Sequence, residues 1–558
     1  MSFFSDQLPA CLGFKADDPE SRSCIAPALA LALAFIVLPL CLLTPFDTDR
    51  SLPLLFLPAV WLGWKNSQPV SPGLLSLIIA IFAAMLLSTA FAAHSARSLV
   101  SVSAAAWVIA GGMVARNLTS SLPAVRLVLG GIVLGAALGS VLVLAGAGGA
   151  YMDFPTYWGA RIFSMHQYAG VVAGLGLWAL RPASPAARLA VIALCAVTCI
   201  GLASSGSRAP VAGLLIMLAA WFWRGGTTDR RLLLRTAPAL AGVALTVSWL
   251  IGSPYATMGW WSAVARTANA DSIQDVASGR AYFWPVVWHQ VWNSPWFGHG
   301  ADAYQYIQPR LHGSQPHNAL LQWLYEYGLA GTFPIVLLLV AGVVGLTRKG
   351  PAPENPTRTF RIWAGSTLAG TFVYGLFDGV FYHMVAFMPA AVIAGFALGG
   401  QASVAPGNSV YLRNWHRILR PGLLAALLAI LLHGWLGFML LRAGNVEPDS
   451  PPARLLRAFP STTFGLKNWI HRWEKSHPEA VIDWIKWAQS ASNAQPEYHL
   501  AAVTIQLHNR DFISAEKELR ACLPKVRDIE VDDINRLLAG VAVKAKEQAA
   551  NGTTKATK

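Results

Sequence analysis

Apolar runs long enough to cross a lipid bilayer recur along most of this chain and constrain its fold more than any other feature. A helix needs about 20 predominantly apolar residues to span about 30 Å of hydrocarbon. About thirteen such runs lie at approximately 25–45, 51–64, 73–92, 98–115, 125–147, 165–180, 189–203, 210–223, 237–253, 319–346, 362–377, 384–400 and 421–441. We therefore predict an all-α, polytopic membrane protein with about thirteen transmembrane helices.

The composition supports this class and excludes several others. Of the 558 residues, 54% are hydrophobic and only 13% are charged, which is too few charges to cover a soluble protein of this size. The six cysteines offer neither a disulfide framework nor a Cys-x-x-Cys metal motif, since three of them fall inside apolar runs. A polar stretch precedes the first run, which is therefore predicted to be a span with a cytoplasmic leader and not a cleaved signal peptide.

Basic residues set the predicted orientation. With a cytoplasmic N-terminus, the inner loops hold about eighteen Lys and Arg residues and the outer loops about seven, the bias that the positive-inside rule requires. The remaining seventeen lie in the C-terminal tail. The net charge of +14 is therefore mainly a topology signal, and no nucleic-acid partner is expected. An odd number of spans places the C-terminus outside, and we predict a bacterial inner-membrane protein with a periplasmic tail.

Two predicted outer regions are large, a periplasmic loop over about 252–316 and a tail after the last span. We divide the chain into a transmembrane domain over 1–445, which includes that loop, and a helical periplasmic domain over 446–558. The tail is charged and shows helical periodicity. Residues 496–525 resemble one tetratricopeptide-type helical hairpin, with Ala515 at the close helix contact. A small helical domain of no defined family is the alternative interpretation.

Three polar residues at the outer ends of predicted spans are candidates for chemistry, because polar groups there are costly unless they face water or have a function. Arg208 lies in a short outer turn, Arg280 in the large outer loop, and His317 where that loop re-enters the membrane. Each has a structural alternative, since outer arginines often contact lipid headgroups and a lone histidine is usually structural. We favour structural or interfacial roles for His166, His289, His299 and His383.

Motifs around these residues resemble the O-antigen ligase superfamily. A His-Asn pair, followed by Leu-Gln and then Glu-x-Gly-x-x-Gly, lies within residues 316–331 and is similar to the signature of that superfamily. The other similar segments are Gly206–Arg208, Ser278–Arg280, Ser294–Gly300 and Phe377–Gly379 with Pro389. The similar segments span about residues 160–400, and their order and spacing carry the resemblance.

One segment departs from the pattern of the superfamily. Where members often have Gln-Pro-Asn or Asn-Pro-Asn, this chain has the stretch from Arg161 to Ala169. Arg161 and Gln167 can stand in for the missing element, but the asparagine is absent.

The resemblance implies a metal-independent, inverting glycosyltransferase that moves a glycan from undecaprenyl pyrophosphate to an acceptor hydroxyl at the outer face of the inner membrane. Such a transfer needs a base for the hydroxyl and cations for the departing pyrophosphate. His317 suits the first role, and Arg208 and Arg280 suit the second because guanidinium groups bind phosphate oxygens in a fork.

Six further residues are predicted to bind substrate: Asn318, Gln322, Arg161, Gln167, Glu326 and Asp378. Asn318 and Gln322 are four residues apart and can face one cavity, with interhelical hydrogen bonds as the alternative. Glu326 continues that face and either holds an arginine or packs between helices. We expect neither a metal ion nor a cofactor, and the absence of a glycine-rich phosphate loop argues against a nucleotide-sugar donor.

Within this superfamily the acceptor is a protein Ser or Thr, lipid A core, or another glycan repeat unit. The odd span count and the long tail favour the O-oligosaccharyltransferases, with a pilin-like acceptor protein. An O-antigen ligase acting on lipid A core and a polysaccharide polymerase are the alternatives. A lipid-linked oligosaccharide flippase is a different class, but inverted repeats and charged helices near the midplane are not found. A tetratricopeptide scaffold would explain the tail and not the motifs. The expected partners are thus the lipid-linked glycan, the acceptor and membrane lipids.

Overall fold

A computed structural model gives the fold of most of the chain. It describes residues 19–41, 49–63, 70–92, 95–145, 160–180, 184–251, 280–307, 315–344, 356–399, 420–432, 476–492, 496–523 and 528–556, with a few isolated positions between them. Every regular element of these ranges is a helix, so the predicted all-α class is confirmed for the described residues. The predicted domain boundary at 445/446 lies outside the described part of the chain.

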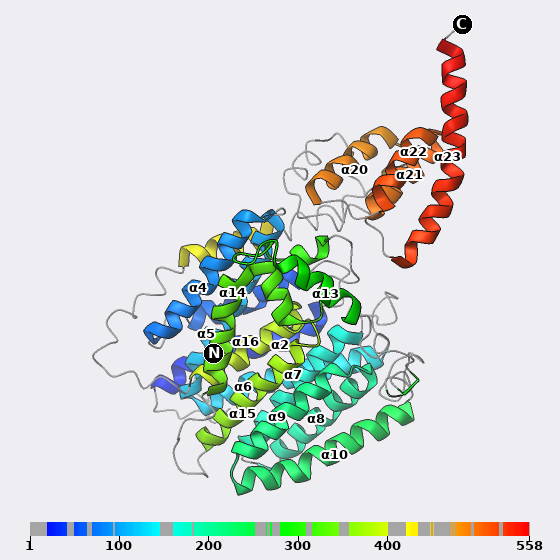
Figure 1. The fold of residues 1–558 in the computed structure, drawn as a ribbon. Helices are drawn as coiled ribbons and strands as arrows, with labels where there is room; N and C mark the ends of the chain where they lie inside the picture. Colours follow the sequence, from blue (N-terminus) through cyan, green and yellow to red (C-terminus); the bar gives the residue numbers. More distant parts are fainter. Residues whose placement is uncertain are drawn as a thin grey trace.

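The helices of the membrane part follow one another with short connections (Figure 1). Its first half contains α2 (Pro19–Cys41), η2 (Asp49–Phe56), α3 (Leu57–Gly63), α4 (Pro72–Phe91), α5 (Ser95–Asn117), η4 (Leu118–Ser120) and α6 (Leu122–Leu144). Its second half contains α7 (Ala160–Ala179), α8 (Pro185–Ser205), α9 (Ala209–Arg224), α10 (Thr227–Ile251), α13 (Arg280–Val291), η5 (Ala303–Tyr306), α14 (Ala319–Val344), α15 (Pro356–Gly375) and α16 (Met384–Gly399).

Seven helices of the described residues are long and apolar enough to cross a membrane, namely those within 23–41, 72–91, 97–120, 122–144, 185–205, 227–250 and 319–344. Four shorter apolar helices lie at 50–63, 209–224, 384–399 and 420–432. The described residues of each apolar run predicted from the sequence are mainly helical. The number of thirteen spans and the periplasmic side of the loop and tail stay predictions.

Serine and proline start three of these helices. Ser71, Ser121 and Ser184 precede α4, α6 and α8, and each hydroxyl oxygen accepts a hydrogen bond from the backbone N–H three residues on, at 3.1 to 3.5 Å. A proline lies in the first turn of each helix, where no intrahelical N–H donor is needed. These local signals explain why the helices begin where the apolar runs do.

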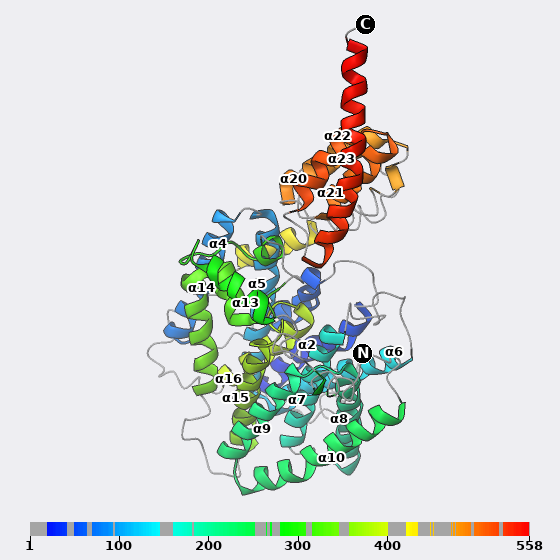
Figure 2. The ribbon, with the colours of Figure 1, turned by 45° about the vertical axis from the view of Figure 1, so that its right-hand side comes forward.

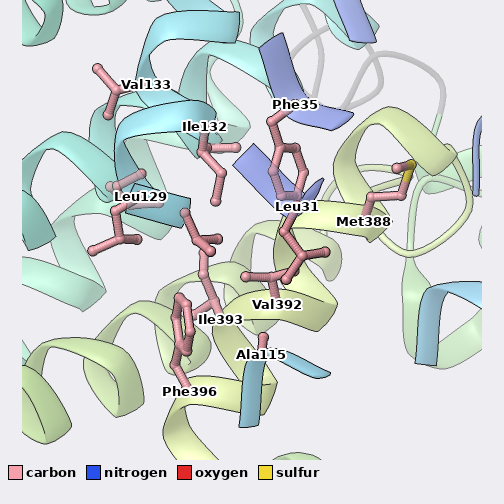
Figure 3. Packing of buried hydrophobic residues seen from close by; sticks show 14 of the residues in the cluster. Leu31, Phe35, Ala115, Leu129, Ile132, Val133, Met388, Val392, Ile393 and Phe396 are labelled. Atoms are coloured by element: carbon pink, nitrogen blue, oxygen red, sulfur yellow. The ribbon is translucent and has the colours of Figure 1, made fainter. Parts of the chain in front are cut away.

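The core of the membrane part joins α2, α5, α6 and α16 (Figure 3). Leu31 and Phe35 of α2 are fully buried in one cluster with Leu129 and Ile132 of α6 and with Val392 of α16. At the crossing of α5 and α16, a Cβ atom on Gly395 would collide with the backbone carbonyl of Gly112. Glycine therefore permits this close approach, as is common where membrane helices pack.

The C-terminal tail forms a second group of helices, which stand apart from the membrane bundle in both views (Figures 1 and 2). These helices are α20 (Pro478–Ser492), α21 (Pro496–His508), α22 (Phe512–Cys522) and α23 (Asp528–Ala556). Consecutive helices pack on one another around buried Val503, Ala515 and Leu519. The sequence thus predicted the hairpin of α21 and α22 and the contact at Ala515, and its assignment to the tetratricopeptide class stays a prediction.

Candidate functional site

The N-terminal end of α14 carries the His-Asn pair in a strained turn. The backbone φ of His317 is +52°, a left-handed conformation that costs energy for a residue with a side chain. Asn318 starts the helix, because its Oδ1 accepts from the N–H of Leu321 at 2.9 Å. The indole N–H of Trp284 in α13 donates to the carbonyl of Pro316 at 2.8 Å and ties the turn to the outer loop. The turn therefore holds the His317 ring in one orientation.

The two ring nitrogens of His317 have different partners. Nε2 lies 2.6 Å from Nη1 of Arg161, and Nδ1 lies 3.0 Å from Oδ1 of Asp378. A guanidinium can only donate, so Nε2 accepts, and Nδ1 carries the proton that it donates to Asp378. The backbone N–H of Gly379 also donates to Asp378 Oδ1, at 2.9 Å. Asp378 therefore fixes the tautomer in which Nε2 can act as a base.

Burial and charge set the protonation states of this pair. Burial lowers the pKa of His317 below its ordinary value, although the hydrogen bond and charge of Asp378 partly oppose the change. Burial alone would raise the pKa of Asp378, but the hydrogen bond from His317 and the charges of His317 and Arg161 lower it. The site therefore holds a neutral imidazole beside a carboxylate at neutral pH.

Arg161 contacts the imidazole, the charge of Arg280 acts on it, and the charge of Arg208 acts on Arg280. Arg280 begins α13 and donates from Nη2 to the carbonyl of Phe377 at 2.8 Å. Its pKa is lowered by burial and by the positive charges of Arg161 and Arg208, with Asp378 acting in the opposite direction. Two further guanidiniums and one carboxylate therefore lie near enough for their charges to act on Arg280. The site carries an excess of positive charge.

Four helices point their N-termini at this region. Arg161 is the second residue of α7, Arg208 is the N-cap of α9, Arg280 is the first residue of α13, and His317 precedes α14. The free N–H groups of a helix N-terminus carry partial positive charge and bind anions. Side chains and backbone together therefore give this region a positive potential that would favour an anion beside His317. His317, Arg161, Arg208, Arg280 and Asp378, all predicted from the sequence, come together here.

Of the other predicted residues, Gln167, Gln322 and Glu326 lie elsewhere, and Asn318 lies beside His317. Gln167 is fully buried within the bundle, where its Oε1 accepts from Ser140 at 2.7 Å and its Nε2 donates to the carbonyl of Ala136 at 3.1 Å. Gln322 donates to Glu326 at 3.1 Å, and both line a narrow apolar pocket of about 130 Å³ between α4, α5, α14, α15 and α16. Asn318 uses its oxygen as a helix cap.

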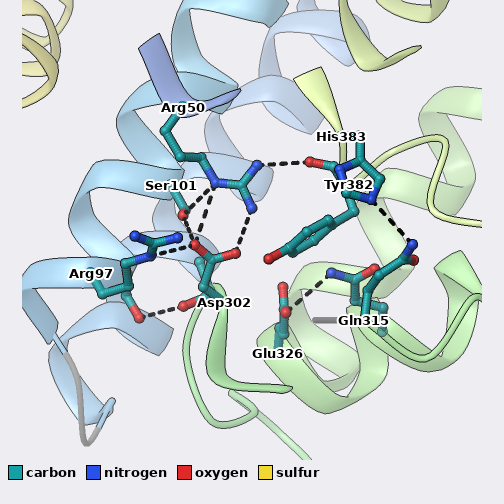
Figure 4. A network of polar contacts seen from close by, with 11 residues as sticks. Arg50, Arg97, Ser101, Asp302, Gln315, Glu326, Tyr382 and His383 are labelled. Carbon is teal, nitrogen blue, oxygen red and sulfur yellow. Dashed lines mark hydrogen bonds and ion pairs between the residues drawn. The ribbon is translucent and has the colours of Figure 1, made fainter. Parts of the chain in front are cut away.

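A second polar cluster, which we call the Asp302 cluster, consists of Arg50, Arg97, Ser101, Asp302 and Tyr382 (Figure 4). Arg50 Nη2 lies 2.6 Å from Oδ1 of Asp302, and Arg97 Nε lies 3.0 Å from Oδ2. Burial alone would raise the pKa of Asp302, but the charges of the two arginines and the hydrogen bonds from Arg50 and Ser101 lower it strongly. None of its members was among the candidate residues predicted from the sequence.

The two clusters meet at the segment from Asp378 to His383. Arg50 donates to the carbonyl of Tyr382 at 2.8 Å, and its guanidinium lies 4.4 Å from the centre of that ring. Gln315 Nε2 lies 3.1 Å from His317 Nδ1 and 3.4 Å from His383 Nε2. Burial lowers the pKa of His383 to about 3, so this histidine is neutral. Gln315 and His383 are therefore neighbours of His317 that were not selected from the sequence.

The Glu-x-Gly motif interrupts α14 and forms backbone hydrogen bonds with the outer loop. Gly328 has φ +62° and ψ −166°, so the helix is interrupted there. The backbone N–H groups of His299 and Gly300 donate to the carbonyls of Tyr325 and Glu326, both at 2.9 Å. In return, Leu329 and Ala330 donate to Pro295 and Trp296 at 2.8 and 3.0 Å. A Cβ atom on Gly298 or Gly328 would collide with the opposing backbone. Both glycines are therefore needed for this backbone pairing.

Within the described residues, no group of three or more His, Cys, Asp or Glu side chains could hold a metal ion. Comparison with protein families gives one finding, a match of residues 189–336 to the family model of O-antigen ligase. The matched range contains Arg208, Arg280, His317 and the Glu-x-Gly break. No curated protein matches the chain.

Proposed function

The chain carries an O-antigen ligase domain and so falls in the O-antigen ligase superfamily, and on this premise we propose that it is a protein O-oligosaccharyltransferase. It would transfer a glycan from undecaprenyl pyrophosphate to the hydroxyl of a Ser or Thr in a periplasmic acceptor protein such as a pilin. The observation that carries the proposal is a neutral His317 amid Arg161, Arg208 and Arg280 at the converging ends of four helices.

His317 would act as the base for the acceptor. In the resting site Arg161 occupies Nε2, so the acceptor hydroxyl has to replace that contact. As the hydroxyl oxygen attacks the anomeric carbon, its proton passes to Nε2, and the carbon–oxygen bond to the pyrophosphate breaks with both electrons going to the leaving group. Asp378 stabilises the imidazolium that forms, through the hydrogen bond at Nδ1. Attack opposite the pyrophosphate inverts the anomeric centre.

The arginines would hold the leaving group. A pyrophosphate gains negative charge as the bond breaks, and guanidiniums and helix N-termini that are already in place stabilise that charge without reorganisation. Arg208 and Arg280 are suited to this role because they lie at the N-termini of two different helices, α9 and α13. The superfamily itself implies a lipid-linked glycan donor and an acceptor.

An acceptor assay tests the proposal. The purified full chain is reconstituted with undecaprenyl-pyrophosphate-linked glycan and is offered a pilin-like protein or lipid A core in separate reactions. We expect glycan on a Ser or Thr of the protein, with no transfer to lipid A core. Transfer to lipid A core alone would identify the alternative, an O-antigen ligase. Glycan that crosses the membrane without reaching either acceptor would identify a flippase.

A further inference from the structure

A charged pocket lies at the end of the bundle opposite His317. It encloses about 440 Å³, and its lining residues come from the end of α7, the start of α8 and the start of α10. Arg161 and Trp178 lie near opposite ends of α7, and 17 residues of helix span about 25 Å. The charge bias predicts that this end is cytoplasmic. We call it the basic pocket.

Three arginines line the basic pocket, Arg188 on α8 and Arg231 and Arg235 on α10, and all three are exposed. Arg231 and Arg235 are four residues apart and so share one face of α10. The pocket also contains Asp229, but its carboxylate is engaged: Oδ2 accepts from the N–H of Gly226 at 3.1 Å, and Oδ1 accepts from the hydroxyl of Thr359 at 3.3 Å. The pocket therefore keeps an excess of two positive charges.

An independent observation indicates a ligand with an acceptor atom. The indole Nε1 of Trp178, which also lines the basic pocket, is buried and has no hydrogen-bond partner among the described residues. A buried donor without an acceptor is costly, and most such groups in folded proteins are satisfied. An anionic oxygen in the pocket would satisfy the indole and the guanidiniums together.

An apolar surface continues from the pocket along α8 and α10. Leu189 and Ile192 of α8 are 68% and 42% exposed, and Leu234 of α10 is 64% exposed. Ile192 follows Arg188 by four residues and extends the same helix face. Figures 1 and 2 both show α10 on the outside of the bundle beside α8, and the two helices pack together. A ligand with a charged end and an apolar chain fits this arrangement better than a free ion.

We propose that the basic pocket binds an anionic phospholipid of the membrane, with the headgroup phosphate among Arg188, Arg231 and Arg235 and an acyl chain along the exposed face of α8 and α10. Basic pockets between helices on the cytoplasmic side of membrane proteins are suited to such headgroups. The proposal does not depend on glycan transfer, since the pocket shares no residue with the site around His317.

Lipid titration of the purified full chain, followed by native mass spectrometry, tests the proposal. The probes are phosphatidylglycerol, phosphatidylcholine and inorganic phosphate. The test variant is Arg231→Gln with Arg235→Gln. The matched control is Arg224→Gln with Arg230→Gln, which removes two exposed charges at the same end of the bundle from residues that do not line the pocket.

We expect phosphatidylglycerol to bind the wild type and the control alike and the test variant about 30-fold more weakly, at roughly fivefold per arginine. Trp178→Phe removes only the N–H donor and should weaken binding about tenfold. An equal loss in test and control variants would reduce the effect to general surface charge and overturn the proposal. Equal affinity for inorganic phosphate or for phosphatidylcholine would also overturn it.

Discussion

The site around His317 and the Asp302 cluster both place arginines beside a carboxylate, yet they balance charge differently. In the Asp302 cluster, Arg50 and Arg97 approach the two oxygens of one buried aspartate, and Ser101 and the carbonyl of Tyr382 complete the contacts. At the other site, Arg161 meets an imidazole and Arg280 meets a backbone carbonyl. The first arrangement is closed by its own partners, whereas the second leaves positive charge for an anionic ligand.

This difference separates a structural role from a chemical one. The Asp302 cluster connects η2, α5, the outer loop and the segment before α16. Removing one member would leave uncompensated charge in the interior, so the cluster should affect folding. The residues of the His317 site lie at helix ends, and a ligand can replace their present hydrogen-bond partners. Substitutions of these residues should therefore affect transfer more than stability.

The largest expected effect is on stability. Asp302→Asn removes the charge between two arginines and should destabilise the fold by about 3–5 kcal/mol, the usual result of breaking a buried pair. Unfolding of the purified protein in detergent measures this loss. Asp483→Asn, at an exposed position of the tail, is the control and should change stability by less than about 0.5 kcal/mol. If the Asp302→Asn protein were as stable as the wild type, the cluster would not have the structural role assigned to it.

Arg280→Lys should have the opposite effect to Asp302→Asn: it should lower transfer and leave stability almost unchanged. A lysine keeps the charge but cannot reproduce the fork of the guanidinium, and a charged hydrogen bond contributes about 1.5–3 kcal/mol. Transfer should therefore fall roughly 10- to 100-fold, with the unfolding temperature nearly unchanged. Arg50→Lys is the counterpart in the Asp302 cluster and should lose mainly stability. If both variants lost the same property, the two clusters would not differ in kind.

Asn318 gives a smaller test at the edge of the site. Loss of the N-cap in Asn318→Ala should cost about 1 kcal/mol of stability, and Asn318→Ser should restore most of it because serine also caps helices. Thermal unfolding measures both variants. Transfer should recover with serine as well. Activity that stays low in a stable Asn318→Ser protein would instead favour the predicted contact of Asn318 with substrate.

The smallest expected effect is a shift in pH dependence. A base acts only when neutral, so transfer should rise with pH through the pKa of His317 and level off above it. Because burial lowers that pKa, the midpoint of the rise should lie below pH 6.5, the ordinary value for histidine. Asp378 opposes the lowering, so Asp378→Asn should move the acidic limb to still lower pH. A limb that moved upward, in rates measured across a pH series, would contradict the assigned roles.

The sequence was sufficient for the helices and for the residues around the base, for two different reasons. Apolar runs and Ser-Pro starts are local signals, so α4, α6 and α8 could be predicted closely from composition and order. The grouping of Arg208, Arg280 and His317 came from motif order and not from periodicity, because these residues lie on three different helices.

The Asp302 cluster could not be predicted in the same way. Arg50 and Asp302 are 252 residues apart, and neither belongs to a motif that the sequence analysis used. Gln167 was predicted because it can stand in for the missing motif, but it lies about nine Å further along α7 than Arg161 by helix rise and is hydrogen-bonded within the bundle. The pairing of residues that are distant in the sequence, and the depth at which a residue lies along a helix, can be determined only once the packing of the whole bundle is known.

Single-turnover glycan transfer by His317→Ala tests the central claim most directly. The variant and the wild type are reconstituted as full chains with lipid-linked glycan and acceptor, and donor binding and unfolding temperature are measured in parallel. The base contributes about 10²- to 10⁴-fold, so transfer should fall by that factor while donor binding and stability stay close to the wild-type values. Transfer at a rate near that of the wild type, from about pH 6 to about pH 8, would show that His317 is not the base.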